Sequence, residues 1–167
     1  MINKKNDHYQ TDLFKPIIKE IESISSTNVA TPHRVIADHL RMLSFSIADG
    51  VMPSNEGRGY VLRRVLRRAS RYARILDLKE PFIYQLVDVL VNIMGDAYPE
   101  LVEKKDHIKS VIRSEESSFL KTLDKGMIIF NEMVSSLKKN DKISGKNAFK
   151  LYDTYGFPID LTLLLAK

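Results

Sequence analysis

Seven of the ten arginines stand close together, in a segment that contains no Asp or Glu. The segment covers residues 58–74, and its arginines are Arg58, Arg63, Arg64, Arg67, Arg68, Arg71 and Arg74. A guanidinium group binds phosphate oxygens through two parallel hydrogen bonds. The formal net charge of the chain is +5, so the remainder without these seven charges is mildly acidic. This distribution predicts a local anionic partner, with phosphate as the natural candidate.

The segment that begins at Tyr60 has the spacing of an amphipathic helix. At about 100° per residue, the apolar residues from Leu62 to Leu76 fall on one face and the arginines on the opposite face. We call the latter the arginine stripe: Arg63, Arg64, Arg67, Arg68, Arg71 and Arg74. A solvated face paired with acids elsewhere in the protein is the alternative interpretation. The helix itself lacks acids at i+4, which favours an external anion.

Two polar residues near helix ends are candidates for ligand contact. Asn55 lies in a glycine-containing loop before the stripe, which lacks the Lys-Ser/Thr ending of a P-loop. Its amide can form hydrogen bonds with a base edge. Asn also tolerates turn conformations, and the pattern alone favours neither interpretation. Asp153 lies between Tyr152 and Tyr155 and either caps a turn or contacts a ligand.

No catalytic or metal-binding constellation is recognisable. The chain has no cysteine, and its four histidines lack the spacing of a ligand pair. His39 with Asp38 or Asp49 resembles an acid/base pair, although a packed structural histidine is the favoured interpretation. A nucleophile elbow and a glycine-rich cofactor motif are both missing. We therefore expect no catalytic residue and no metal, and the residues alone indicate a binding module.

The residues that position these groups have helical periodicity almost throughout. The chain has 167 residues with ordinary globular composition, 44% hydrophobic and 28% charged. We predict an all-α helical bundle with one long helix in its C-terminal half and little or no sheet. The expected helices lie around 13–21, from an N-cap at Thr31 to about Gly50, over 60–76, over 81–94, from Pro99 to about Lys139 with Gly126 as its weakest point, and over 147–155.

A signal sequence and a membrane-spanning apolar stretch are not recognisable in the sequence. We therefore expect no membrane association and a cytoplasmic location.

Several stretches together resemble the alanyl-tRNA synthetase family. The most specific are NEGRGYVLRR (55–64) and LYDTYGFP (151–158), and further similarity covers residues 11–22, 34–41, 48–71, 94–101, 115–126 and 148–162. The similar region of the family is the helical tRNA-recognition part that follows the class II catalytic core. The resemblance divides the chain into residues 1–30, the end of the core region with one helix, and residues 31–167, the recognition domain.

The resemblance implies binding to the acceptor stem of alanine tRNA, whose identity depends on a G·U pair. Asn55 and Asp153 correspond to the two residues that recognise this pair, and the seven arginines would hold the flanking backbone. The parent enzyme would attach alanine by using ATP and Mg²⁺, and its editing domain would hold Zn²⁺. The expected partners are this tRNA and the remaining domains of the synthetase.

The family's class II motifs and its editing domain have no counterpart in these residues. We expect them upstream and downstream, so this chain alone should neither activate alanine nor edit mischarged tRNA. Two other functions stay open at this point. One is a helical protein-interaction module that docks on an acidic partner, and the weaker one is an autonomous enzyme.

Overall fold

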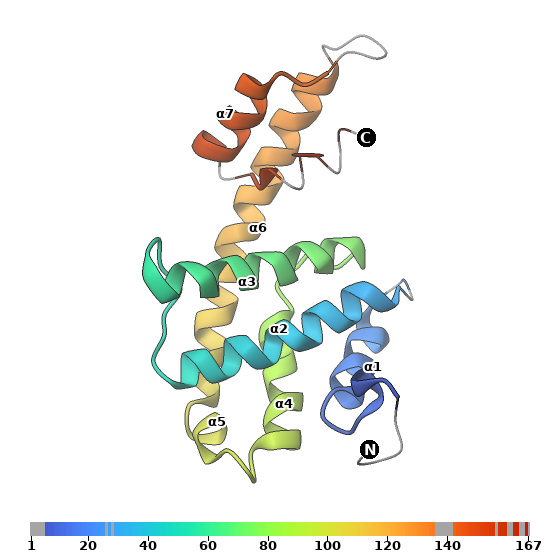
Figure 1. The fold of residues 1–167 in the computed structure, drawn as a ribbon, viewed down its shortest axis with the longest axis vertical. Helices are drawn as coiled ribbons and strands as arrows, with labels where there is room; N and C mark the ends of the chain where they lie inside the picture. Colours follow the sequence, from blue (N-terminus) through green and yellow to red (C-terminus); the bar gives the residue numbers. More distant parts are fainter. Residues whose placement is uncertain are drawn as a thin grey trace. The chain divides into compact units, whose positions relative to one another are not determined.

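The computed structural model describes residues 6–25, 27, 29–135, 142–155, 157–159, 162–163 and 166. These residues form two compact units, Met1–Ser117 and Ser118–Lys167, which are drawn in Figure 1. Only helices and connecting segments occur in the described ranges, so the predicted all-α fold is confirmed. None of the described helices is long and apolar enough to cross a membrane.

The first unit contains most of the helices. They are η2 (His8–Gln10), α1 (Lys15–Ile24), α2 (Ala30–Ala48), α3 (Gly57–Ile75), η3 (Ile83–Gln85), α4 (Leu86–Met94), α5 (Pro99–Glu103) and the first part of α6 (Lys105–Ser135). The remainder of α6 and α7 (Gly145–Tyr155) belong to the second unit. The predicted division at residue 30 concerns regions of the family and stays a prediction; α1 itself packs on α2 and α4.

The most extensive packing in the first unit is between α2 and α3, which lie side by side in Figure 1. Both helices bury the apolar stripe that the periodicity predicts. The buried residues include Ile36, Leu40, Leu43 and Ile47 of α2 and Leu62, Leu66, Ala69 and Ala73 of α3. This burial fixes which face of α3 is packed into the first unit.

The start of α2 differs from the prediction. The helix begins at Ala30 and its N-cap is Val29, so Thr31 is not the cap. Pro32 is nevertheless accommodated because the first four N–H groups of a helix have no intrahelical acceptor. The helix ends as a Schellman motif, in which Gly50 N donates to Ile47 O and Val51 N donates to Ser46 O, both at 2.9 Å.

The long helix predicted from Pro99 is interrupted at Lys104. This residue separates α5 from α6 and donates its Nζ to Ala48 O at the end of α2, at 2.5 Å. Beyond this point α6 continues through Gly126 to Ser135, as predicted, and the expected end near Lys139 lies outside the described residues. A Cβ on Gly126 would lie 2.2 Å from the Phe157 ring. Glycine at this position therefore permits close packing within the second unit.

A buried acid shapes the start of the predicted helix over 81–94. The side chain of Glu116 on α6 accepts from the N–H groups of Phe82 and Ile83, both at 3.2 Å. These residues consequently lead into the short η3 helix before α4 begins at Leu86. Burial raises the pKa of the Glu116 carboxyl to about 8, although the two N–H donors act in the opposite direction.

Candidate nucleic-acid interface

The arginines of α3 divide into two groups by exposure. Arg58, Arg64 and Arg68 are exposed, whereas Arg63, Arg67, Arg71 and Arg74 are partly buried. Within the described part of the chain, no carboxylate pairs with the three exposed arginines. Their guanidinium groups are therefore the cationic groups on α3 that are most accessible to an external phosphate.

Glu115 of α6 pairs with two arginines of the stripe. Its Oε1 lies 3.1 Å from Arg63 Nε, and it accepts from Arg67 Nε at 3.1 Å, with Arg67 Nη2 also at 3.1 Å. For Arg63 and Arg67 the structure therefore supports the alternative interpretation, in which an acid elsewhere in the protein pairs with the stripe. The compensating acid comes from another helix, which spacing within α3 cannot reveal.

Tyrosines contact two of the exposed arginines, Arg64 and Arg68, without neutralising them. The Arg64 guanidinium lies 5.7 Å from the centre of the Tyr60 ring, and the Arg68 guanidinium lies 6.0 Å from that of Tyr72. Arg71 also approaches Tyr72, at 5.6 Å. Such cation–π contacts restrict a guanidinium and leave its positive charge intact.

The loop that carries Asn55 is held against the first turn of α3. Ser54 Oγ donates to Glu56 O at 2.8 Å. A Cβ on Gly59 would lie 2.2 Å from Met52 O and 2.3 Å from Ser54 Oγ, so only glycine allows this approach. Arg63 Nη1 donates to Asn55 Oδ1. The structure thus brings two predicted site residues, Asn55 and Arg63, into direct contact.

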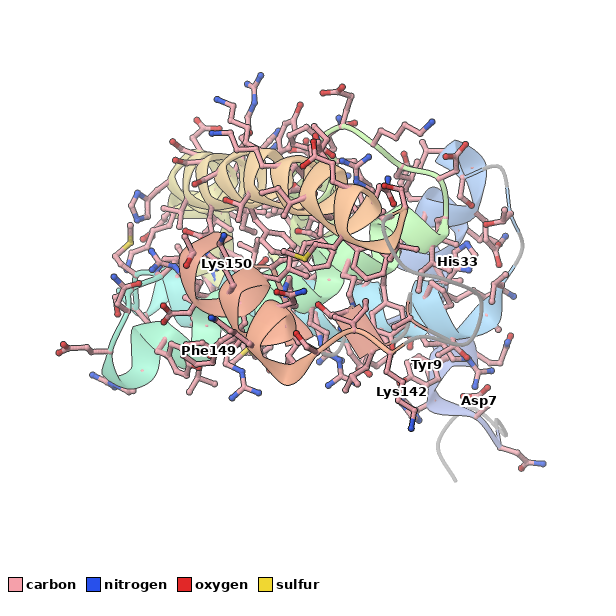
Figure 2. All side chains as sticks on the ribbon, turned by 90° about the horizontal axis from the view of Figure 1, so that it is seen from above. Asp7, Tyr9, His33, Lys142, Phe149 and Lys150 are labelled. Carbon is pink, nitrogen blue, oxygen red and sulfur yellow. The ribbon has the colours of Figure 1, made fainter. Side chains whose placement is uncertain are left out.

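Asp153 lies in the second unit, on the last part of α7. Its side chain is exposed, and no described residue forms a hydrogen bond or ion pair with it. Phe149 and Tyr152 on the same helix are 62% and 49% exposed. The side chains of α7, including the labelled Phe149 and Lys150, can be followed in Figure 2. Asp153 is consequently accessible, and a capping role for it is not supported by any described contact.

His39 does not form an acid/base pair with Asp38. The Asp38 carboxylate instead accepts from Tyr9 Oη at 2.6 Å, and this bond raises the pKa of Tyr9 to about 12. Tyr9 and Asp7 lie together near the N-terminal turn in Figure 2. Burial lowers the pKa of His39 below its ordinary value, and the positive charge of Arg68 is the second cause of this shift. A partly buried histidine whose charged form is disfavoured agrees with the structural interpretation.

The described residues contain no group of three or more potential metal ligands. A hollow of about 430 Å³ in the first unit is lined by Tyr84, Lys109, Ser110, Arg113, Ser114 and Ser117. Its lining is cationic and hydroxylic, without a carboxylate or imidazole for acid/base chemistry.

Sequence reasoning missed two acids with specific contacts: Glu115, which pairs with arginines of α3, and Glu116, which is buried. A signal for Glu116 was present, since it falls on the apolar stripe of α6 between Ile112 and Phe119, where an acid must be buried. Glu115 carries no such signal, because its role depends on how α6 lies against α3.

Comparison with known proteins agrees with a synthetase. A family model described as tRNA synthetases class II (A) matches residues 1–167. The alanine–tRNA ligase of Staphylococcus saprophyticus is 54% identical over 162 residues, which are 93% of this chain and 18% of that protein. The alanine–tRNA ligase of Staphylococcus epidermidis is 52% identical over 166 residues, 95% of this chain and 19% of that protein.

The chain thus spans about a fifth of the length of the curated relatives that it matches. The match of the family model over the whole chain shows the family. This chain belongs to the class II (A) tRNA synthetases.

Proposed function

We propose that this chain is the acceptor-stem-recognition part of an alanine–tRNA ligase, whose complete form attaches alanine to its tRNA with ATP. The observation that carries the proposal is the arrangement on α3, where three exposed arginines lie on the helix that follows Asn55. The relatives' printed activity supports the choice of tRNA as the nucleic acid.

The arginines supply affinity in this proposal. Arg58, Arg63, Arg64, Arg67, Arg68, Arg71 and Arg74 form the predicted backbone-binding set, and the exposed members have the best access to phosphates. Phosphate contacts set affinity and register but carry no sequence information. Discrimination must therefore come from groups that contact base edges.

Asn55 and Asp153 are the proposed base-reading residues. In a G·U wobble pair the guanine 2-amino group lacks its partner in the minor groove, and uracil O4 is displaced into the major groove. An amide donates or accepts and a carboxylate accepts, so both groups distinguish this pair from G·C. A good base contact contributes about 1–3 kcal/mol.

In this proposal, the catalytic parts of the complete ligase are not among the residues of this chain. By the family resemblance, ATP, Mg²⁺ and the editing Zn²⁺ are assigned to the other domains of the whole protein. Alone, the chain is expected to bind acceptor stems without activating alanine or editing mischarged tRNA.

The test measures binding of the 167-residue chain to two acceptor-stem hairpins that differ only in G·U or G·C at the identity position. We expect tighter binding to G·U, and Asn55→Ala and Asp153→Ala should each narrow the difference by about 5-fold or more. Asn92→Ala and Asn131→Ala are matched controls, because both residues are exposed and lie outside the site.

Equal weakening of both hairpins by Asn55→Ala and Asp153→Ala would contradict the reading role. Equal binding of both hairpins by the unmodified chain, displaced by an acidic polypeptide as readily as by RNA, would favour the protein-interaction alternative.

A further inference from the structure

We propose that Arg63 and Glu115 are positioning residues for Asn55, which fix its amide so that the NH₂ group is presented to the RNA. The inference rests on the proposed function, in which Asn55 contacts a base. It adds Glu115 to the site and changes the role of Arg63 from phosphate binding to orientation of a neighbouring side chain.

The direction of the hydrogen bond follows from the chemistry of the guanidinium group. Arg63 carries only N–H donors, so the amide atom that faces its Nη1 is Asn55 Oδ1. The oxygen of the amide is therefore engaged within the protein. The NH₂ group makes no hydrogen bond to a described residue, and in this proposal it selects an acceptor on the RNA.

Glu115 forms an ion pair with Arg63, although the Arg63 Nε–H group makes no hydrogen bond. Its Oε1 lies 3.1 Å from Arg63 Nε, while Nη1 of the same guanidinium reaches Asn55. The side chains of Arg63 and Glu115 are 22% and 12% exposed, so water screens this pair less than a surface ion pair. Arg67 Nε donates to the same carboxylate at 3.1 Å and restrains it further.

The backbone beneath Asn55 is restrained as well. Ser54 Oγ bonds to Glu56 O, and the loop approaches Gly59 so closely that a Cβ there would collide with it. Side chain and backbone are therefore both fixed before a ligand arrives. Such preorganisation reduces the entropy that binding must otherwise remove.

Arg63 is thereby withdrawn from the phosphate-binding set. A guanidinium engaged by a carboxylate and an amide has fewer N–H groups left for a phosphate. The exposed Arg64, one residue further along α3, has no such contacts among the described residues and serves as the matched control.

The first test measures the order of the Asn55 side-chain NH₂ group by NMR relaxation in the free 167-residue chain. We expect an order parameter near that of rigid structure, about 0.8, and a fall below about 0.6 in Arg63→Lys, because an ammonium cannot serve Asn55 and Glu115 in the same geometry. Glu115→Gln should also lower the order parameter of the Asn55 NH₂ group. Arg64→Lys should leave it unchanged, and amide exchange over α2 and α3 checks that each variant is folded.

The second test is a double-mutant cycle on the ratio of the Kd values for the G·C and G·U hairpins. When Asn55 is present, Arg63→Lys should lower this ratio by about 5-fold. In the Asn55→Ala background, Arg63→Lys should have little further effect on the ratio. Asn55→Asp, which keeps an acceptor for Arg63 but loses the NH₂ group, should lower the ratio as much as Asn55→Ala.

The outcomes separate the two proposals. An Asn55 amide that stays equally ordered in Arg63→Lys, or an equal effect of Arg63→Lys with and without Asn55, overturns the positioning role. Loss of order in Arg63→Lys, combined with an Asn55→Ala variant that still prefers G·U, supports the positioning of the amide and overturns the proposed reading role of Asn55.

Discussion

Asn55 and Asp153 are presented in different ways. Asn55 is held by Arg63, which is itself held by Glu115, whereas Asp153 projects from α7 without a hydrogen bond or ion pair to a described residue. A held side chain loses little freedom on binding, while an unheld one loses about 0.5–1.5 kcal/mol of rotamer entropy. The same proposed task is thus supported by side-chain contacts in one unit and by the helix alone in the other.

The cores beneath the two residues differ as well. The first unit buries apolar residues from α1 to α6 and the Glu116 carboxyl. The described core of the second unit is the small cluster Phe119, Leu120, Leu123, Phe130, Leu151 and Phe157. The placement of Asp153 therefore depends on few contacts, with Phe157 at their centre, where it stacks on Phe130 at 6.3 Å and packs on Gly126.

The largest expected effect comes from removing Phe157. Phe157→Ala should destabilise the second unit by about 3–5 kcal/mol, because the side chain is fully buried and its loss leaves a cavity. Hydrogen exchange of α7 amides should accelerate accordingly, and the contribution of Asp153 to G·U preference should disappear. Exchange over α2 and α3 should not change.

Phe149→Ala is the matched control for this experiment, since Phe149 is 62% exposed on α7. Its effect on the stability of the second unit should lie within about 0.5 kcal/mol. Equal acceleration of exchange in α3 and α7 by Phe157→Ala would show that the two units unfold together, and the comparison between them would then fail.

An effect that is smaller per pH unit is expected from the pH dependence of the first unit. The folded state raises the pKa of Glu116 from 4.5 to about 8, so between these values the folded chain keeps a proton that the unfolded chain has lost. The contribution of Glu116 to the free energy of unfolding is fully present below about pH 4.5. It decreases as the pH rises toward 8, by up to about 1.4 kcal/mol per pH unit. Urea unfolding followed by amide exchange in α3 and α4 measures it.

Glu116→Gln should flatten this pH profile, because the amide does not titrate, while its single oxygen replaces one of the two acceptors for the Phe82 and Ile83 N–H groups. Glu103→Gln, at an exposed position of α5, should leave the profile as it is. A slope that persists in Glu116→Gln would assign the pH dependence to another group.

Periodicity predicted the helices because burial requires one apolar face per helix, and α2 and α3 bury the expected residues. The boundaries at Ala30 and Lys104 were missed for physical reasons. The start of α2 uses no side-chain cap, and the break at Lys104 is accompanied by a bond from its ammonium to the end of α2. Such contacts arise only when distant segments meet.

The site was predicted in the same incomplete way. The position of the arginines on one face of α3 follows from spacing alone. Asn55 and Asp153 were candidates because they lie near helix ends, and the family resemblance implied their base-reading roles. Neither approach reveals Glu115, since an acid 48 residues from Arg67 becomes its partner only through packing. The same packing divides the stripe into paired and exposed arginines.

The smallest expected effect distinguishes these two groups of arginines. Arg64→Ala and Arg68→Ala should each lower the slope of log Kd against log salt concentration by about 0.7 to 0.9, the value for one lost phosphate contact. Arg63→Ala should change this slope much less, because its charge is already offset by Glu115. Measurement of hairpin binding at several salt concentrations tests this difference. If Arg63→Ala lowers the slope as much as Arg64→Ala, the pair with Glu115 must open when RNA binds, and the Asn55 amide then loses its support at the moment of recognition.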